Sequence, residues 1–240
     1  MFNKKTHHLQ LADHSMIYYE TYGQGMPLFL LHGNSGSTLY FKNQIHVLKK
    51  YFKIYAVDLR GRGQSIDYAS KINYQLMVND LLTILKHEHL TKINLLGFSD
   101  GANLALLFSE HYPQYINKLI LNAANNSFTD LTPTAKLRFK LTNDILKLGE
   151  KYFPKLNKFQ HYFQLAFANL HINFQKLAHF KFPVLILVGQ FDIVKKEFSQ
   201  KLAHTFPNAQ LIIEPHVGHS FALERPNTYN KYVLNFLNNK

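Results

Sequence analysis

Short apolar segments alternate with amphipathic segments along most of this 240-residue chain, and that alternation limits the folds open to it. The strands it predicts are residues 16–22, 27–31, 53–57, 93–96, 116–123, 184–188 and 209–213. The helices it predicts are residues 39–50, 74–89, 102–111, 198–205 and 225–238. Strands alternating with helices indicate βαβ units, and hence an α/β fold with a mostly parallel central sheet and helices on both faces. Residues 16–22 alternate in polarity, which is typical of an exposed strand.

Residues 126–182 interrupt this alternation of strands and helices, because they contain helical patterns and no convincing strand. The first helix is indicated by apolar positions that share one helical face, at Leu137, Leu141, Ile145 and Leu148. Further helices are expected around residues 162–170 and 174–178. A helical insertion between two strands of an α/β sheet is expected to cover the carboxyl edge, where such sheets place their sites. We therefore predict a single domain over residues 1–240, with a helical lid at about 126–182.

The net charge of +12 suggests an anionic partner, but the sequence does not concentrate this charge. Lysines are scattered and form only short pairs, so we expect no nucleic-acid binding. Every apolar run is far shorter than a membrane-spanning helix requires, so no membrane span is expected. The basic N-terminal residues lack the apolar stretch of a signal peptide, which favours a cytoplasmic protein.

Metal and cofactor chemistry finds little support in the composition. The chain has fourteen histidines and no cysteine. His87 and His89 have the wrong spacing to place both rings on one helical face, and no H-E-x-x-H motif occurs. A glycine-rich phosphate loop of the G-x-x-x-x-G-K-[ST] type is also absent from the sequence. We therefore expect neither a metal nor a cofactor.

The pentapeptide Gly97-Phe98-Ser99-Asp100-Gly101 lies between a predicted strand and a predicted helix. A serine hydroxyl is a weak nucleophile and must be held where a base can reach it. A sharp strand-to-helix turn achieves this, but it strains the serine backbone and crowds its neighbours. Small residues two positions before and after the serine relieve the crowding. Ser99 is therefore the candidate nucleophile.

Three other segments, residues 30–34, 188–192 and 217–220, follow predicted strands. Together with the serine turn they resemble the α/β-hydrolase superfamily over essentially the whole chain. The order Ser99, Asp192, His219 matches the nucleophile, acid and base of that family. His32-Gly33 resembles its oxyanion loop, residues 58–65 its D-x-R-G-x-G-x-S loop, and Gly218-His219 with Glu224 and Pro226 its C-terminal motif. Within the superfamily, the serine pentapeptide with Ala124-Asn125 resembles the biphenyl-hydrolase-like and small carboxylesterase branch.

The resemblance implies a division of roles among these residues. His219 would accept the Ser99 proton during attack on an acyl carbon and return it to the leaving group, while Asp192 orients the imidazole. Two backbone N–H groups, those of Asn34 and Asp100, would bind the oxyanion. His216 and Asp130 are the weaker alternatives for the base and the acid. Ser65 is expected to be a hydroxyl in a turn. Asp58, Arg60 and His32 are expected to fix the loops in which they lie.

The substrate side of the site is less sharply defined by sequence. Phe98, Asp100, Phe163 and Phe167 are expected to line the pocket, although most lid aromatics must pack its core. Asp100 either points away to cap or solvate the following helix, or faces the pocket and pairs with a cationic substrate group.

The leading prediction is a serine hydrolase that cleaves a small to medium carboxylic ester. Thioesterase, lactonase, amidase, perhydrolase and C–C bond hydrolase chemistry remain alternatives on the same triad. A non-catalytic ligand-binding or sensor protein of the same fold is the alternative of another class.

Overall fold

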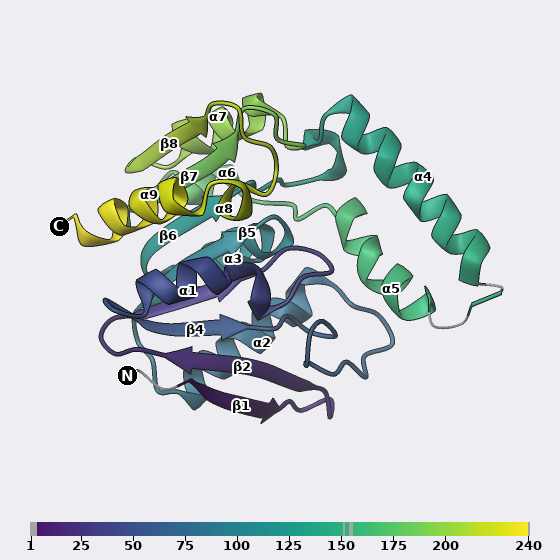
Figure 1. Ribbon diagram of the computed structural model, residues 1–240, viewed down its shortest axis with the longest axis horizontal. Coiled ribbons are helices and arrows are strands. Elements are labelled where there is room, and N and C mark those ends of the chain that lie inside the picture. The colour runs from purple at the N-terminus through teal and green to yellow at the C-terminus, as the bar shows by residue number, and fades with distance from the viewer. Residues whose placement is uncertain (1–3, 151, 154–155, 240) are drawn as a thin grey trace.

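Figure 1 shows the computed structural model of the protein, which describes residues 4–150, 152–153 and 156–239. Within these residues eight strands form one sheet in the order β1-β2-β4-β3-β5-β6-β7-β8. They are β1 (Lys5–Gln10), β2 (Met16–Tyr22), β3 (Pro27–Leu31), β4 (Lys53–Val57), β5 (Ile93–Phe98), β6 (Ile116–Asn122), β7 (Val184–Gly189) and β8 (Ala209–Glu214). β1 and β2 are antiparallel to their neighbours, and all other neighbouring strands pair in parallel. The predicted mostly parallel sheet is confirmed.

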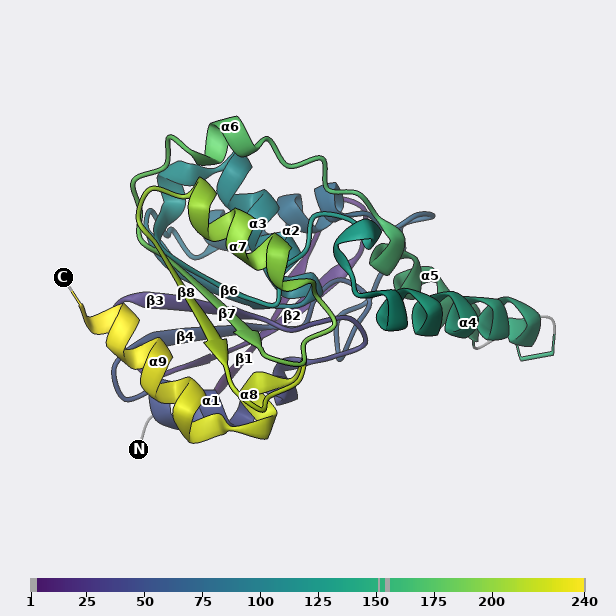
Figure 2. The same cartoon turned by 90° about the horizontal axis from the view of Figure 1, so that it is seen from above.

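Helices cover both faces of this sheet, as Figure 2 shows from above. One face carries α1 (Lys42–Leu48), α8 (Phe221–Glu224) and α9 (Pro226–Asn238), and the other carries α2 (Tyr74–His87), α3 (Asp100–His111) and α7 (Lys196–Thr205). Short 3₁₀ turns η1 (Thr38–Phe41) and η2 (Pro113–Tyr115) lead into α1 and β6. Central strands such as β5 and β7 are buried along their whole length, because helices pack on both of their sides. This double burial explains their continuous apolar sequences.

The first edge of the sheet differs from the prediction. Strand β1 was not predicted from the sequence Lys-Thr-His-His-Leu-Gln, whose side chains are mostly exposed. It forms because its backbone pairs with β2 in register from Lys5–Thr21 to Gln10–Met16. The expectation that residues 16–22 are an exposed strand is wrong: β2 is buried from Ile17 to Thr21, since β1 shields its outer edge and places β2 second in the sheet.

A helical insertion connects β6 to β7, in the region predicted as a lid. It contains η3 (Phe128–Asp130), α4 (Pro133–Glu150), α5 (Leu156–Phe163), η4 (Gln164–Phe167) and α6 (Phe174–Leu177). Residues 151 and 154–155 of the predicted lid lie outside the described residues. In Figure 2, α4 and α5 project together beyond the body of the molecule. The apolar face predicted for α4 is a helix face, but its side chains are exposed to solvent, whereas Ala135 and Leu146 on the opposite side are buried.

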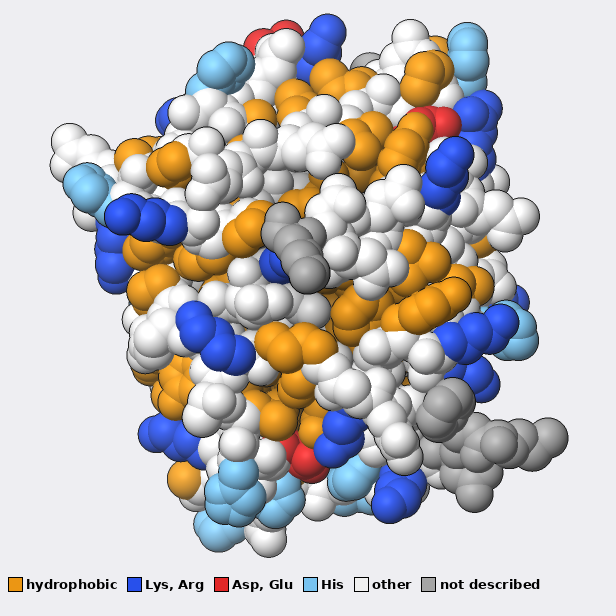
Figure 3. All heavy atoms as spheres, turned by 90° about the vertical axis from the view of Figure 1, so that its left-hand side faces the viewer, with side chains coloured by type: hydrophobic (Ala, Val, Ile, Leu, Met, Phe, Trp, Pro, Cys, Tyr) orange, Lys and Arg blue, Asp and Glu red, His pale blue; other side chains and the backbone are white. Residues whose placement is uncertain are grey.

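One face of the molecule carries its positive charge in a dispersed form. On the face that lies opposite the α4–α5 projection, Lys and Arg side chains are interspersed with apolar and neutral ones (Figure 3). Among the helices that the structure describes, none combines the length and the apolar character needed to cross a bilayer.

Arg60, in the loop after β4, joins three segments through its guanidinium group. Nε and Nη2 donate to the two carboxylate oxygens of Asp80 on α2 at 2.7 and 2.6 Å, and Nη1 donates to Asp13 at 2.6 Å and Asp67 at 3.1 Å. The guanidinium is almost completely buried. A planar fork with several donors suits this arrangement better than a lysine ammonium.

We expect Arg60→Leu to lower the free energy of unfolding by about 3–5 kcal/mol, because it leaves the Asp80 carboxylate buried without its counter-charge. Urea denaturation at neutral pH measures this change. Arg60→Lys keeps a positive charge and should lose less. A loss below about 1 kcal/mol for Arg60→Leu would show that the network contributes little.

Candidate active site

Ser99 occupies a tight turn between β5 and α3. Its φ of 52° and ψ of −119° lie outside the regions that a non-glycine residue adopts easily. A Cβ on Gly97 would overlap the carbonyl oxygen of Gly101, and a Cβ on Gly101 would overlap the carbonyl oxygens of Leu31 and His32. The two glycines therefore allow the start of α3 to pack against the ends of β3 and β5, with the serine at the apex of the turn.

The structure brings Ser99, Asp192 and His219 together at the carboxyl ends of the parallel strands. Nε2 of His219 lies 3.1 Å from Oγ of Ser99, and Nδ1 of His219 lies 2.8 Å from Oδ1 of Asp192. The carboxylate of Asp192 can only accept, so Nδ1 carries the hydrogen in the neutral ring and Nε2 is left to accept the serine proton. Residues separated by up to 120 positions are thus joined in one hydrogen-bonded chain.

The loop that carries Asp192 is tied to the start of the lid. Oδ1 of Asp192 also accepts the Val194 N–H at 3.0 Å. Two further backbone bonds join this loop to the segment between η3 and α4: Thr132 N–H donates to Ile193 O at 2.8 Å, and Lys195 N–H donates to Asp130 O at 2.8 Å. The Asp192 loop and the start of the helical insertion are therefore one connected structure.

The loop that carries His219 is braced by a carboxylate and an aromatic ring. Glu224 accepts the N–H groups of Gly218 at 2.8 Å and Ser220 at 3.1 Å, on either side of His219. Phe98 was predicted to line the pocket, but its ring is buried between Tyr40, stacked at 4.3 Å, and the His219 imidazole at 4.9 Å. Its observed contacts therefore support the position of His219.

The two N–H groups predicted to bind an oxyanion lie on either side of the serine. A Cβ built on Gly33 would be 3.1 Å from the Ser99 Cβ, so the loop after β3 runs directly beside Ser99. Within the part of the chain that the structure describes, neither the Asn34 nor the Asp100 N–H donates to a protein acceptor. Both groups remain available to a bound oxygen, and the Asn34 side chain is held by a hydrogen bond to Tyr162 O at 3.2 Å.

Asp100 is buried at the first turn of α3 and is not solvated there. Its charge is already opposed by Arg62, with Nη2 3.8 Å from Oδ2. Burial raises the pKa of Asp100, while the positive charge of Arg62 acts to lower it. Arg62 in turn lies 4.8 Å from the ring of Tyr162 on α5.

Arg62 is thus a residue of the site that sequence reasoning did not single out. The available signal was a second arginine within the Arg60-Gly61-Arg62-Gly63 run. Its contacts link the serine turn to the lid.

His32 is a fully buried structural residue of the loop after β3. Its Nδ1–H donates to Gly33 O at 2.7 Å, and its Nε2 accepts the Leu59 N–H at 3.0 Å. Protonation would place a second N–H against the Leu59 donor, so the fold requires the neutral ring. Burial lowers the pKa of His32 to about 3.

This lowered pKa predicts acid sensitivity with a definite sign. Between about pH 6.5 and pH 3 the unfolded chain binds a proton at His32 that the folded chain excludes, so stability falls as the pH falls. The expected slope from this residue is about 1.4 kcal/mol per pH unit. Urea denaturation at several pH values should show a shallower slope for His32→Gln, whose amide offers a donor and an acceptor without titrating. Equal slopes for the two proteins would exclude this role.

The predicted pocket residues of the lid lie away from the triad contacts. Phe163 is buried in an aromatic cluster with Phe139, Phe159 and Phe167, at ring distances of 5.5 to 6.1 Å. Phe167 also lines a cavity of about 510 Å³ between η4 and the start of α2, which contains none of the three triad residues.

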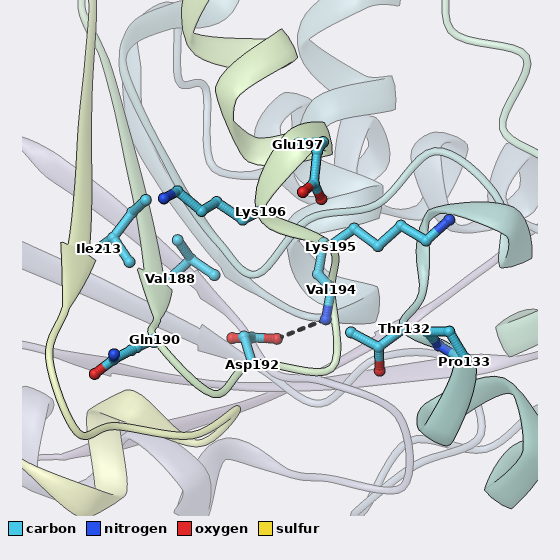
Figure 4. A pocket seen from close by; sticks show the side chains of 11 residues that line it. Thr132, Pro133, Val188, Gln190, Asp192, Val194, Lys195, Lys196, Glu197 and Ile213 are labelled. Carbon is cyan, nitrogen blue, oxygen red and sulfur yellow. Dashed lines mark hydrogen bonds between the residues drawn. The ribbon is translucent and has the colours of Figure 1, made fainter.

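Two further cavities lie closer to the site. One of about 660 Å³ lies between the Asp192 loop, the start of α7 and the first residues of α4 (Figure 4). Another, of about 290 Å³, is lined by Arg62, Tyr162, Phe159, Ser35 and neighbouring glycines. The second lies beside the loop after β3, whose Gly33 is next to Ser99.

The weaker candidates have other partners. Asp130 accepts the Ser127 N–H at 2.8 Å and closes the η3 turn, and the His216 N–H donates to Gln190. Ser65 Oγ donates to Asp58 O at 2.6 Å, and Asp58 binds the N–H groups of Thr38 and Gln64. In the described residues no three His, Asp or Glu side chains are grouped to hold a metal ion.

Comparison with known proteins supports the architecture. Residues 26–146 match a family model described as alpha/beta hydrolase fold. The chain is 27% identical to the AB hydrolase superfamily protein YisY of Bacillus subtilis, over 97% of this chain and 99% of that protein. It is 26% identical to a putative esterase/lipase of Haemophilus influenzae, over 88% and 83% of the two chains.

A solved structure, MGS-M2, an alpha/beta hydrolase enzyme from a Medee basin deep-sea metagenome library, superposes with a TM-score of 0.86. It covers 98% of both chains at 21% identity, a level at which the likeness concerns the fold.

Proposed function

The chain belongs to the alpha/beta hydrolase fold family, and from this premise we propose that it is a serine hydrolase that cleaves a small to medium carboxylic ester through an acyl-enzyme on Ser99. The observation that carries the proposal is the position of His219, whose two ring nitrogens lie 3.1 Å from Ser99 Oγ and 2.8 Å from Asp192 Oδ1. This is the geometry in which an imidazole removes a serine proton while a carboxylate stabilises the resulting imidazolium.

In the first half of the reaction, Ser99 Oγ attacks the acyl carbon as its proton passes to His219 Nε2. The carbonyl oxygen becomes an oxyanion, which the N–H groups of Asn34 and Asp100 stabilise. Donors aimed at this developing charge contribute most when they are fixed in place, and both belong to backbone held by packed loops. Collapse of the tetrahedral intermediate breaks the ester bond, and His219 gives its proton to the departing alcohol.

In the second half, water replaces the alcohol. His219 Nε2 accepts a proton from the water as its oxygen attacks the acyl-enzyme, and the same two N–H groups bind the second oxyanion. The carboxylic acid is released when His219 returns the proton to Ser99. Asp192 accepts the hydrogen bond from the ring Nδ1 and holds the imidazole in one orientation.

The buried ion pair beside the nucleophile bears on the choice of substrate. Because Arg62 already faces the Asp100 carboxylate, a cationic substrate group would have to displace an internal counter-charge. We therefore propose a neutral ester rather than an amine-bearing one. The name of the Haemophilus relative, a putative esterase/lipase, agrees with ester cleavage.

Labelling with a fluorophosphonate probe tests the proposal directly. The native protein should react rapidly, and peptide mapping should locate the adduct on Ser99. Absence of labelling would favour a sensor or binding protein of the same fold. A panel of p-nitrophenyl esters graded by acyl length, with a thioester, a lactone and an amide, then decides the bond that is cleaved; a preference for one of the latter three would replace the ester.

A further inference from the structure

Helix α4 exposes a continuous apolar stripe to solvent. The exposed fractions of its side chains are 60% for Leu137, 55% for Leu141, 69% for Ile145 and 70% for Leu148. Spacings of four, four and three residues place them on one side of the helix. The buried side of α4, which includes Ala135 and Leu146, already supplies its packing against the protein. The stripe is therefore surface that the fold itself does not use.

Positive charge accompanies the stripe. Arg138, Lys140 and Lys147 on α4 are exposed beside it. Asp144 lies four residues from Lys140 and three from Lys147, so its charge is opposed along the helix. Over residues 133–163 the sequence has seven Lys or Arg against two Asp or Glu. An apolar stripe with basic flanks is the pattern by which a helix lies in the surface of an anionic bilayer.

The position of the helix suits such contact. Figure 2 shows α4 and α5 projecting beyond the sheet and its covering helices, so a flat surface can reach them without meeting the body first. Phe153, which follows α4, is also exposed. The four side chains of the stripe lie on successive turns of one helix, so they form a continuous apolar surface rather than isolated exposed residues.

We propose that the exposed face of α4 docks on an anionic lipid surface, with Leu137, Leu141, Ile145 and Leu148 entering the region between headgroups and acyl chains. A second copy of this chain is a poorer occupant of the stripe, because pairing two such faces would bring Lys140 and Lys147 toward their own counterparts. A lipid surface that carries negative charge satisfies both the apolar stripe and its basic flanks. This inference does not depend on the proposed hydrolase activity.

The absence of tryptophan from the sequence allows a direct test. Ile145→Trp places one tryptophan in the stripe. Tyr51→Trp places one at an exposed position just before β4, at the end of the sheet where the parallel strands begin. Vesicles of equimolar phosphatidylcholine and phosphatidylglycerol should shift the emission of the first protein to the blue and leave the second unchanged. Vesicles of phosphatidylcholine alone should have a much smaller effect. Equal shifts at both positions, or none at position 145, would overturn the proposal.

Flotation with the same vesicles measures the contribution of each part of the surface. Leu141→Gln/Ile145→Gln should weaken binding by at least about tenfold, since affinity follows the apolar area buried. Lys140→Gln/Lys147→Gln should weaken it by about fivefold for each lysine. The charge-matched control Lys86→Gln/Lys231→Gln, at exposed positions on α2 and α9, should have little effect. All these sites are exposed, and thermal unfolding checks that each variant is folded.

Three results would contradict the proposal. The first is vesicle binding that survives Leu141→Gln/Ile145→Gln. The second is vesicle binding that Lys86→Gln/Lys231→Gln reduces as strongly as the α4 lysine variant does. The third is a dimer, detected by light scattering, that Leu141→Gln/Ile145→Gln dissociates, together with no binding of the native protein to anionic vesicles. That outcome would assign the stripe to a second copy.

Discussion

Ser99→Ala is expected to lower kcat toward an activated ester by about 10⁴- to 10⁶-fold, because the members of a triad act as one unit and the loss of the nucleophile removes the acyl-enzyme route. The residual rate would come from substrate binding and the two N–H groups near the serine. Alanine can occupy the same turn, since the crowding there is relieved by Gly97 and Gly101. The change should therefore leave the free energy of unfolding nearly unaltered or slightly improved.

Steady-state kinetics with a p-nitrophenyl ester measure this effect. Ser70→Ala is the matched control, because Ser70 is an exposed residue of the loop before α2. A small effect is expected there. Turnover by Ser99→Ala at the rate of the native protein would refute the mechanism.

Asp192→Ala should reduce kcat by about 10⁴-fold, the second largest effect we expect. Without the carboxylate, His219 loses the partner that holds its Nδ1–H and the charge that stabilises its protonated form. Asp192→Asn separates these two contributions. Oδ1 accepts from both the His219 ring and the Val194 N–H, which favours the amide oxygen in that position and so preserves the imidazole tautomer. The amide removes the charge and replaces Oδ2 by an NH2 group, but it keeps the acceptor that orients the ring, so the loss should be at least about tenfold smaller than for alanine.

Kinetic measurements on the two variants, with circular dichroism as the check on folding, decide between these contributions. Equal losses for alanine and asparagine would mean that the negative charge, rather than the orientation of the ring, is what Asp192 provides. A negligible loss for both would remove Asp192 from the proposed triad.

The predictability of the fold follows from how each strand is stabilised. Strands β3 to β7 were predicted because most of their side chains are buried, which requires apolar residues. The edge strand β8 is only partly buried, but it still carries the apolar run 211–213. Strand β1 carries no such demand, since it is held by backbone pairing to β2 and its side chains face water. Missing β1 also caused the wrong expectation for β2, because the burial of a strand depends on what lies beside it.

The site divides in a similar way. Ser99 and its glycines form a local motif whose sterics can be derived from five consecutive residues. The partnership of Asp100 with Arg62 could not be derived, because it depends on how the loop after β4 meets the start of α3 in space. Likewise, Phe98 was visible as an aromatic residue beside the serine, but its stacking with Tyr40 and His219 is a product of tertiary packing.

Helix α4 illustrates the limit of periodicity. The spacing of Leu137, Leu141, Ile145 and Leu148 indicated a helix, and a helix of 18 residues is present. Periodicity reports that apolar residues share a face, but it does not report where that face points. The smaller set on the other side, with Ala135 and Leu146, is the one that packs inward.

The bonds between residues 130–132 and 193–195 bear on how this enzyme scaffold can be altered. Because residues 130–132 and the segment after Asp192 share backbone hydrogen bonds, we expect replacement of the helices from position 133 onward to leave Asp192 in place, and a cut before position 130 to disturb it. A protein engineer who grafts another cap onto this sheet should carry both short segments over as one graft, or expect a well-folded chimaera with a misaligned carboxylate.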